Sequence, residues 1–427
     1  MKNFKLYLCL AALAACQGGK EPAEDIRPVE PDPEVVQDIP YIRRVDIDLT
    51  EGEKLIAQQS RIFAFDLLQT VHRNEDSQKN IFISPLSLNL ALLMLNNGAA
   101  GGTQKELENI LGGGTVSNET LNTFAQKMVK AMQELDTRAV FESANSIWIR
   151  KDFPVLELFK ETNRQYYEAE VRNEDFALPS TLGLINGWVE EKTHGKVPQI
   201  LTGIDPSALM YLINTLYFKG LWEYPFAKEA TVDKPFYNPD GSTPALPTMH
   251  AVRTDHVLQT ELFSMMELPF GNRAFSMVIL LPNEGVSLDA VLESLNAETW
   301  EQYLADLPKK TYTVNLQLPR FTIEYEKTLN DDLKALGLPA IFENSDFSRI
   351  NADAGLFVSS VLQKTFAQVD ETGMEGAAAT LIGMVGANIN EEVPPSLDFH
   401  VNRPFLFFIK EQSTGIPFFS GVVKHPD

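Results

Sequence analysis

The sequence predicts an α+β fold with one large β-sheet. Helical patterns dominate the first part of the chain, whereas strand patterns dominate its end. The 427 residues are 44% hydrophobic and include 26 Phe, so a sizeable core is possible. Length alone would allow two or three average domains or one large domain with appendages. Because the chain has no internal repeat, a repeat architecture is not indicated.

The folded domain is expected to begin near Leu55 with an amphipathic helix. Its apolar positions recur at helical spacing, at Leu55, Ile62, Phe63, Phe65, Leu67 and Leu68. A short buried strand is predicted at 81–83. Ser84 can cap the next helix, Pro85 fits its first turn and Gly98 suits its end. Since that helix is apolar nearly all round, we expect it in the interior.

The third helix is predicted from Thr103-Gln104-Lys105-Glu106, a capping-box pattern, with Gly112 as its stop. Further on, helical and strand patterns alternate irregularly. A helix is predicted at 184–193, with a stop at Gly195, and strands are predicted at 144–149, 210–218 (buried), 275–281, 313–321, around Phe399, 405–409 and 416–423. In the strand at 313–321 the inward side chains are expected to be Val314, Leu316 and Leu318.

The first 15 residues read as a signal peptide, because two lysines precede an apolar run that is too short to span a bilayer. Leu13-Ala14-Ala15-Cys16 resembles the lipobox of bacterial lipoproteins, so Cys16 is the expected lipidation site. The protein would then be a cell-envelope lipoprotein on the outer membrane or cell surface. Ordinary signal-peptidase cleavage would instead leave a secreted protein. Residues 16–50 are acidic and Pro-rich, and we interpret them as a spacer.

Charge and motifs exclude several functions. The formal net charge of -22 argues against nucleic acid as a partner and against electrostatic docking on anionic lipid. The only cysteines are Cys9 and Cys16, so the body has neither a disulfide nor a cysteine-based metal site. No catalytic motif is present, and we expect no enzyme, metal or cofactor. His250 and the pair Asp255-His256 are interpreted as a polar turn rather than metal ligands.

Residues 369–395 form the least core-like stretch of the body and read as a long loop. Small residues run from Gly376 to Thr380, and two prolines close the segment. Taken with period two, one face carries only apolar, small or hydroxyl side chains, namely Met374, Gly376, Ala378, Thr380, Ile382 and Met384, while Glu375 lies on the other face. One face could therefore be buried if the loop became a strand.

Over residues 55–427 the chain resembles the serpins. The resemblance rests on collinear segments, Asn80-Ile-Phe-Ile-Ser-Pro-Leu-Ser87, Gly98-Ala-Ala-Gly-Gly-Thr-Gln-Lys-Glu106, Ile185-Asn-Gly-Trp-Val-Glu-Glu-Lys-Thr-His-Gly-Lys196, Ile213-Asn-Thr-Leu-Tyr-Phe-Lys-Gly-Leu-Trp222, Leu318-Pro-Arg-Phe321, Asn402-Arg-Pro-Phe-Leu-Phe407 and Phe418-Phe-Ser-Gly-Val-Val423. It implies three β-sheets, eight or nine helices and an exposed C-terminal reactive loop. The serpin domain would span 51–427, with the reactive loop at about 371–395.

The resemblance also implies a protease inhibitor that acts as a suicide substrate. A protease cleaves the loop, becomes trapped as an acyl-enzyme, and is carried away when the cleaved arm inserts into the main sheet. A serine protease is the expected target, with a cysteine protease as a further possibility, and the inhibitor is expected to be a monomer. The alternative is a non-inhibitory serpin that serves as a binding or interaction protein.

The resemblance assigns roles within the loop. The hinge comprises Glu371, Gly373, Met374, Glu375, Gly376, Ala377, Ala378, Ala379 and Thr380. Two of its residues depart from the inhibitory pattern: Met374 replaces Thr or Ser at the first side chain to enter the sheet, and Gly376 replaces Ala. Counting 17 residues from Glu371 places the reactive bond at Ala387-Asn388, with Met384, Val385 and Asn390 as alternatives. A small or apolar residue there suits an elastase-like or subtilisin-like protease.

Five further residues match the region that controls opening of the main sheet. They are Ser84, Ser87, Asn214, Gln363 and Trp222. The family usually has His where this chain has Gln363, so the expected polar network lacks a pH-sensitive member. Trp222 matches the tryptophan beneath the point where the loop first enters, although a plain core aromatic fits the sequence equally well.

Overall fold

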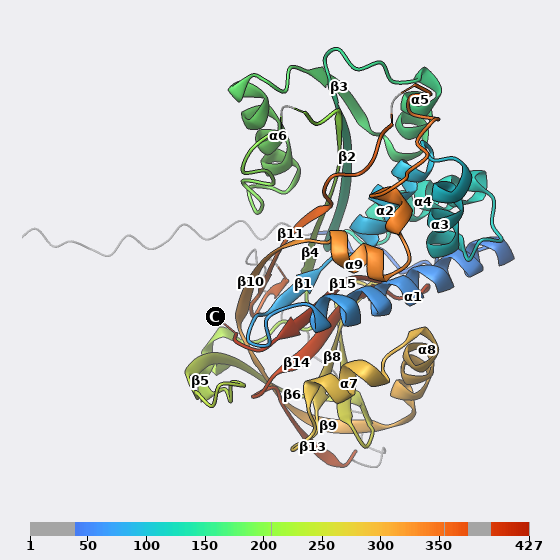
Figure 1. Cartoon of the computed structure of the whole chain (residues 1–427). Coiled ribbons are helices and arrows are strands. Elements are labelled where there is room, and N and C mark those ends of the chain that lie inside the picture. The colour runs from blue at the N-terminus through green and yellow to red at the C-terminus, as the bar shows by residue number, and fades with distance from the viewer. Residues whose placement is uncertain (1–38, 206, 354, 375–393, 427) are drawn as a thin grey trace, which may run out of the picture. The chain divides into compact units, whose positions relative to one another are not determined.

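The structure is a computed structural model that describes residues 39–205, 207–353, 355–374 and 394–426 (Figure 1). Nine α-helices lie in this part of the chain: α1 (Glu51–Arg73), α2 (Pro85–Asn96), α3 (Gly101–Gly112), α4 (Asn118–Glu134), α5 (Glu157–Tyr167), α6 (Pro179–Lys192), α7 (Leu288–Ser294), α8 (Ala297–Asp306) and α9 (Asn330–Ala335). Three 3-10 helices add single turns, η1 (Lys228–Ala230), η2 (Leu307–Lys309) and η3 (Pro339–Ile341).

The main sheet has six strands in the order β10-β11-β12-β4-β2-β3. Their bounds are β10 (Phe321–Thr328), β11 (Leu362–Val369), β12 (Gly373–Met374), β4 (Met210–Leu221), β2 (Ala139–Arg150) and β3 (Glu170–Glu174). Most neighbours pair antiparallel, whereas β2 and β3 pair parallel. In Figure 1, α6 and the helices α2 to α4 lie on opposite sides of β2 and β4, so both faces of the sheet are covered there.

The other nine described strands are connected, eight of them in the order β1-β15-β14-β8-β7-β6-β9-β13 and the ninth, β5, paired to β6. Their bounds are β1 (Ile81–Ile83), β15 (Pro417–Val423), β14 (Phe405–Glu411), β8 (Phe275–Pro282), β7 (Phe263–Pro269), β6 (Ala245–Gln259), β9 (Thr311–Pro319), β13 (Ser396–His400) and β5 (Val232–Pro235). The end of β6 pairs with β7 and the rest pairs with β5 and β9. Two sheets therefore share this one strand, which with the main sheet gives the three expected sheets.

Local sequence explains where the first two helices start. Thr50 and Glu53 form a capping box at the start of α1. The helix therefore begins at Glu51, four residues before the predicted start at Leu55. Ser84 accepts a hydrogen bond from the backbone N–H of Ser87 and caps α2, and Pro85 occupies the first turn, as predicted. Since all residues of α2 except Ala91 are buried, its predicted interior position is confirmed.

The capping box predicted at Thr103 and Glu106 is wrong. Helix α3 already begins at Gly101, so Thr103 lies in its first turn. The Thr103 hydroxyl accepts from the backbone N–H of Asp346, and the Glu106 carboxylate accepts from that of Ala340. These polar side chains are used for tertiary contacts, which satisfy donors from distant segments rather than the helix's own first turn.

The predicted strands are present, with two corrections. The strand predicted as buried at 210–218 is half-buried, because its side chains alternate between the core and a cavity described below. His250, Asp255 and His256 do not form a turn, since all three lie on β6. Val314, Leu316 and Leu318 point inward and are fully buried, as predicted.

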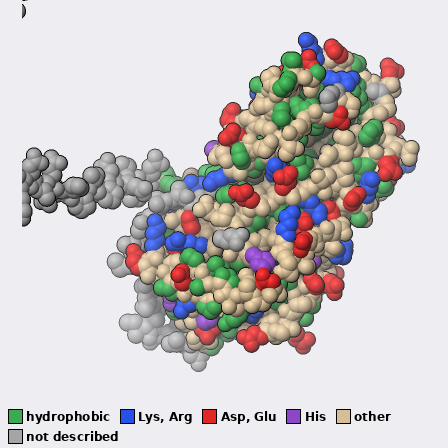
Figure 2. Space-filling view, turned by 60° about the vertical axis from the view of Figure 1, so that its left-hand side comes forward, with side chains coloured by type: hydrophobic (Ala, Val, Ile, Leu, Met, Phe, Trp, Pro, Cys, Tyr) green, Lys and Arg blue, Asp and Glu red, His purple; other side chains and the backbone are tan. Residues whose placement is uncertain are grey.

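Residues 39–50 fall in the range interpreted as spacer, yet they contact the domain. Asn272 donates from its side-chain amide to the Ile42 carbonyl at 3.2 Å, and Ser413 Oγ accepts from the Ile47 N–H at 3.0 Å. No described helix is long and apolar enough to cross a bilayer. Acidic and basic side chains are interspersed on the face shown in Figure 2, so the net negative charge does not form one continuous patch there.

Candidate functional site

The two-residue strand β12 lies between β11 and β4 in the main sheet. Met374 pairs with Val369 of β11 on one side and with Gly220 of β4 on the other. Its side chain is 2% exposed and belongs to the main hydrophobic core. The sequence identified Met374 as the first side chain that must enter the sheet, and the structure has it inside already.

Glycine is required at position 373 by a close backbone approach. A Cβ atom added to Gly373 would lie 1.9 Å from the carbonyl oxygen of Gly220. A Cβ added to Gly220 would in turn lie 2.8 Å from the ring of Phe270. The first step of β12 into the sheet therefore depends on two glycines, Gly373 and Gly220, that lie diagonally across adjacent strands, each one residue away from the other's direct partner.

Trp222 holds the turn that precedes β12, which we call the hinge turn (residues 370–372). Its backbone N–H donates to the Thr372 carbonyl and its indole Nε1 donates to the Asp370 carbonyl, each at 2.9 Å. The indole also stacks on Phe270, with ring centroids 4.6 Å apart and an interplanar angle of 9°. Trp222 is thus more than a core aromatic, because it binds both ends of the hinge turn.

Glu371 anchors the hinge turn to the neighbouring strands. Its carboxylate is 3% exposed and accepts hydrogen bonds from Arg320, at 2.7 Å from Nε, and from the hydroxyl of Thr231. Burial by itself would raise the pKa of Glu371, but the bonds from Arg320 and Thr231 outweigh it and lower the pKa below its ordinary value. The carboxylate is therefore charged and paired at neutral pH.

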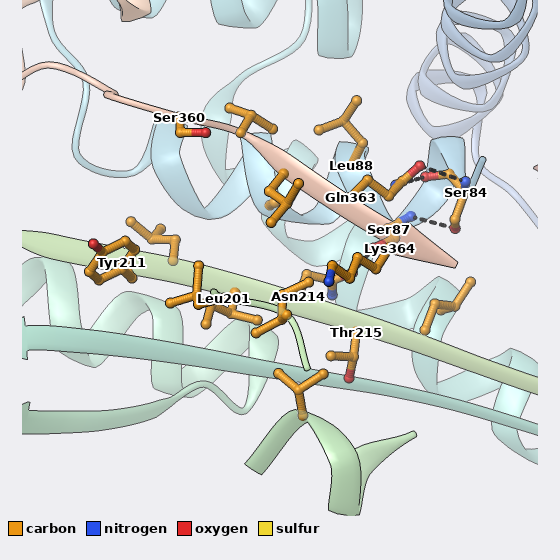
Figure 3. A pocket seen from close by; sticks show the side chains of 18 of the residues that line it. Ser84, Ser87, Leu88, Leu201, Tyr211, Asn214, Thr215, Ser360, Gln363 and Lys364 are labelled. Carbon is orange, nitrogen blue, oxygen red and sulfur yellow. Dashed lines mark hydrogen bonds between the residues drawn. The ribbon is translucent and has the colours of Figure 1, made fainter. Parts of the chain in front are cut away.

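Among the residues that the structure describes, β11 and β4 do not pair with each other. Beyond the β12 pairing, β11 has β10 and β4 has β2 as the one described neighbour. The gap between them, which we call the slot, is a cavity of about 480 Å³. Figure 3 shows side chains from both strands around this space, among them Tyr211 and Thr215 from β4 and Lys364 from β11.

Polar side chains connect α2 to both edges of the slot. On the β11 side, Gln363 accepts from the Ser84 N–H at 3.0 Å and donates to the Ser84 carbonyl at 2.9 Å, as Figure 3 shows. On the β4 side, the Ser87 hydroxyl donates to Asn214, whose amide donates to Asn145 of β2 at 2.7 Å. The two edges are thus tied to α2 separately, and opening the slot has to stretch one of these links.

The comparisons with known proteins agree with this architecture. The family model described as Serpin (serine protease inhibitor) matches residues 58–426. The chain belongs to the serpin family. It is 35% identical to Iripin-5 of Ixodes ricinus, over 85% of this chain and 93% of that protein. It is 30% identical to human Serpin B3, over 87% of this chain and 99% of that protein.

Among solved structures, this serpin is similar to a thermophilic serpin, tengpin, in its native state. The TM-score is 0.76 at 30% identity, and the match covers 92% of this chain and 98% of tengpin. Together with the family match, this confirms the predicted serpin fold with its three sheets and helices. Serpins are in general protease inhibitors rather than enzymes, although some are non-inhibitory.

The structure brings together most of the predicted sheet-opening residues of this serpin. Ser84, Ser87, Asn214 and Gln363 meet around the start of α2, while Trp222 lies at the hinge turn. Gln363 and Asn214 are not bonded to each other, because each reaches a different serine. The remaining predicted positions lie outside the described residues, namely Cys16, the hinge residues Glu375, Gly376, Ala377, Ala378, Ala379 and Thr380, and the reactive-bond candidates Met384, Val385, Ala387, Asn388 and Asn390.

Sequence reasoning missed the partners of the hinge. Arg320 belongs to the quoted segment Leu318-Pro-Arg-Phe321, but nothing local shows that it pairs with Glu371. Thr231 and Asn145 were likewise not singled out. Within the described part of the chain, no three His, Cys, Asp or Glu side chains are grouped so that they could hold a metal ion.

Proposed function

We propose that this serpin inhibits an endopeptidase as a suicide substrate whose cleaved loop inserts into the slot. The observation that carries the proposal is the slot itself, with Gly373 and Met374 already paired at its upper end. A sheet with an unpaired gap between two strands leaves backbone groups of both strands without a ladder partner. A further strand between β11 and β4 would satisfy these groups and bury apolar surface.

The register supports the proposal quantitatively. Met374 pairs antiparallel with Val369 and with Gly220. In an antiparallel pair the partner's number falls by one for each residue added to the strand. Residue 380 would therefore pair with residue 369 - 6 = 363 on one side and with residue 220 - 6 = 214 on the other. Thr380 would then lie between Gln363 and Asn214, where a hydroxyl can join the polar side chains beside α2. Residue 387 comes level with 220 - 13 = 207, and Ser207 is among the last residues that line the cavity. An arm that ends at Ala387 therefore fits the slot.

The chemistry comes from the target protease. Its serine or cysteine attacks the carbonyl carbon of Ala387, the bond to the nitrogen of Asn388 breaks, and that nitrogen takes up the proton that the nucleophile gives up. The protease is then held as an ester or thioester at Ala387. Insertion of the arm carries this linkage along β4 before water hydrolyses it. A small residue at Ala387 favours an elastase-like or subtilisin-like serine protease.

The non-inhibitory alternative rested on Met374 as an unusual hinge residue. In the structure the Met374 side chain is buried in the core between β11 and β4. A flexible thioether fills an irregular space without a polar atom to satisfy, so this residue does not oppose insertion. We therefore favour inhibition. We also propose that Cys16 carries a lipid anchor at the cell envelope and that the protein acts as a monomer.

A panel of elastase-like, subtilisin-like and papain-like proteases tests the proposal. The expected result is a complex that survives boiling in detergent, and mass spectrometry of the released C-terminal peptide identifies the reactive bond. Complete loop cleavage by every protease with no stable complex would refute inhibition. Metabolic labelling with palmitate, compared between the wild type and Cys16→Ser, tests the lipid anchor separately.

A further inference from the structure

A second cavity, of about 560 Å³, lies where the C-terminal end of α1 meets α7. Residues at the ends of three buried strands close it: Pro282 ends β8, Arg403 and Pro404 precede β14, and Lys424 follows β15. We call it the Lys424 cavity. None of the residues that line it also lines the slot, so it is separate from the site where the cleaved loop would insert.

Hydrogen bonds within the protein hold the walls of the Lys424 cavity in place. Gln69 of α1 donates to the carbonyls of Leu292 and Leu295 at 2.8 and 2.7 Å, which fixes α1 to α7. His72 bonds through Nε2 to Asp289 of α7 at 2.7 Å. In Figure 1, α7 lies just below α1. The cavity is therefore preformed, as small-molecule sites usually are.

Lys424 is a buried cation without a counter-ion. The residue is 4% exposed, and its Nζ is buried with no hydrogen-bond partner among the described residues. Its backbone N–H donates to the Asn80 side chain at 2.7 Å, which fixes the start of the lysine side chain. An ammonium group that is removed from water without a partner is strongly destabilised. Burial accordingly lowers the pKa of Lys424, although the carboxylates of Asp289, Asp76 and Glu75 act in the opposite direction.

The two carboxylates that line the cavity near Lys424 and are held by the protein already have other partners. Asp289 pairs with His72. Glu75 pairs with Lys327 at 3.4 Å and also accepts a hydrogen bond from a tyrosine hydroxyl at 2.6 Å. Neither carboxylate forms an ion pair with Lys424, whose Nζ stays unpartnered in the described structure. A negatively charged group from outside the chain would supply the missing counter-ion.

Two further acidic residues lie nearby, and both are exposed. Glu293 lines the cavity from α7, while Asp76 follows the end of α1 and accepts from the Gln78 backbone N–H at 2.8 Å. Water and salt screen an exposed carboxylate, so neither replaces a counter-ion inside the cavity. Together with Asp289 and Glu75, they oppose a ligand that carries more than one negative charge.

Arg403 adds a second cation to the cavity. Its Nε donates to the Pro282 carbonyl at 2.8 Å and its Nη1 to the Asn402 side chain at 2.9 Å. Its Nη2 makes no hydrogen bond to the described residues, so it remains a donor for a ligand. Much of the remaining lining is apolar, namely Pro239, Pro282, Val286, Leu288, Leu292 and Pro404.

We propose that the Lys424 cavity binds a small organic carboxylate, whose charged end pairs with Lys424 and whose apolar part packs against the leucines of α7. Arg403 supplies a second donor from the same cavity. The apolar lining favours a hydrocarbon chain over a sugar or a nucleotide, and the acidic side chains nearby disfavour a doubly charged phosphate. A medium-chain fatty acid has this chemistry. The site is independent of the protease inhibition proposed above.

Calorimetric titration of the purified protein with octanoate at neutral pH tests the site. We expect a dissociation constant below about 1 mM. Octanol lacks the charge and inorganic phosphate lacks the apolar chain, so each should bind at least about tenfold more weakly. Lys424→Met should weaken octanoate binding at least about tenfold, because methionine fills the space of the lysine stem without its charge. Lys234→Met is the matched control, since Lys234 is exposed on β5 and does not line the cavity.

Thermal unfolding distinguishes ligand binding from a structural role of Lys424. Without ligand, Lys424→Met should melt no lower than the wild type, because the substitution removes an unpaired buried charge. Octanoate should raise the melting temperature of the wild type but not of this variant. Val286→Trp, which fills the cavity from a half-buried position and leaves Lys424 unchanged, should also lose binding.

Four results would overturn the proposal. The first is a wild-type protein that does not bind octanoate with a dissociation constant below about 1 mM. The second is octanol or phosphate binding as tightly as octanoate. The third is undiminished octanoate binding in Lys424→Met or Val286→Trp, which would place the ligand elsewhere. The fourth is a lower melting temperature of ligand-free Lys424→Met, which would show that the lysine already has a partner within the protein.

Discussion

Met374 and Gly220 pair through their backbones, so the first side chain of the predicted hinge that must enter the main sheet already lies in it in the intact chain. Its partner on the other side, Val369, belongs to the strand from which the loop departs. The chain therefore leaves β11, reverses through the hinge turn and begins a return strand in the slot. The predictions below follow from this geometry.

Cleavage of the loop should make the protein harder to unfold. An arm of 374–387 that fills the slot adds hydrogen bonds on both sides, each worth about 0.5–1.5 kcal/mol net. After the cost of ordering the arm is subtracted, we expect the melting temperature to rise by more than about 10 °C. Differential scanning calorimetry of intact and nicked protein measures this, and equal melting temperatures would contradict strand insertion.

If the proposed inhibition is correct, Thr380→Arg should leave a protein that proteases cleave but that no longer traps them. In the continued register residue 380 faces α2 between Gln363 and Asn214, where a guanidinium would be buried without a carboxylate partner, at a cost of several kcal/mol. Loop cleavage should remain normal while the yield of trapped protease falls at least about tenfold. Glu375→Arg is the matched control, because position 375 lies on the opposite face. If both variants lose trapping equally, the assignment of faces is wrong.

Gly373→Ala should expel β12 from the sheet. The added Cβ would lie 1.9 Å from the Gly220 carbonyl oxygen, a distance that neither the native nor the inserted state can accommodate without a backbone shift. Faster hydrogen exchange at 373–374 and slower trapping are expected. Gly203→Ala is the control, since a Cβ there meets no atom within 4 Å. Unchanged exchange at the hinge in Gly373→Ala would show that β12 is not constrained by Gly220.

Glu371→Gln should loosen the hinge turn in a pH-dependent way. The pKa of Glu371 is lowered in the folded state, so its stabilising contribution is present above the ordinary value of 4.5 and is lost as the pH falls through the lower folded-state value. We expect the variant to be about 1–3 kcal/mol less stable at pH 7. This difference should shrink as the pH falls below 4.5. Urea unfolding at a series of pH values measures the difference, and a constant difference would exclude Glu371 as its source.

The sequence was informative wherever a residue acts on its immediate neighbours. Ser84 and Pro85 define the start of α2 through contacts within one turn, and alternation in β9 correctly identified Val314, Leu316 and Leu318 as inward. Thr103 and Glu106 show the limit of this reasoning. Their local pattern is that of a capping box, but their side chains bind the distant backbone of Asp346 and Ala340.

The sequence identified many residues of the candidate site, but it did not predict the contacts that these residues make. The serpin resemblance led to Glu371, Gly373, Gln363 and Trp222 by number. The salt bridge to Arg320, the entry of Met374 into the sheet and the hydrogen bond from Asn315 to Asp398 depend on pairings between segments far apart in the chain. No local periodicity encodes such pairings, since they are set by the packing of whole strands.

Under the proposed mechanism, the paired β12 would also favour trapping over hydrolysis of the acyl bond. Starting a new strand is usually slow and entropically costly, because several residues must be fixed before they form stabilising contacts. In this structure the strand is already started, so each further residue of a severed arm would only extend an existing ladder. The acyl bond would then be exposed to water for a shorter time, and fewer inhibitor molecules would be consumed for each protease captured.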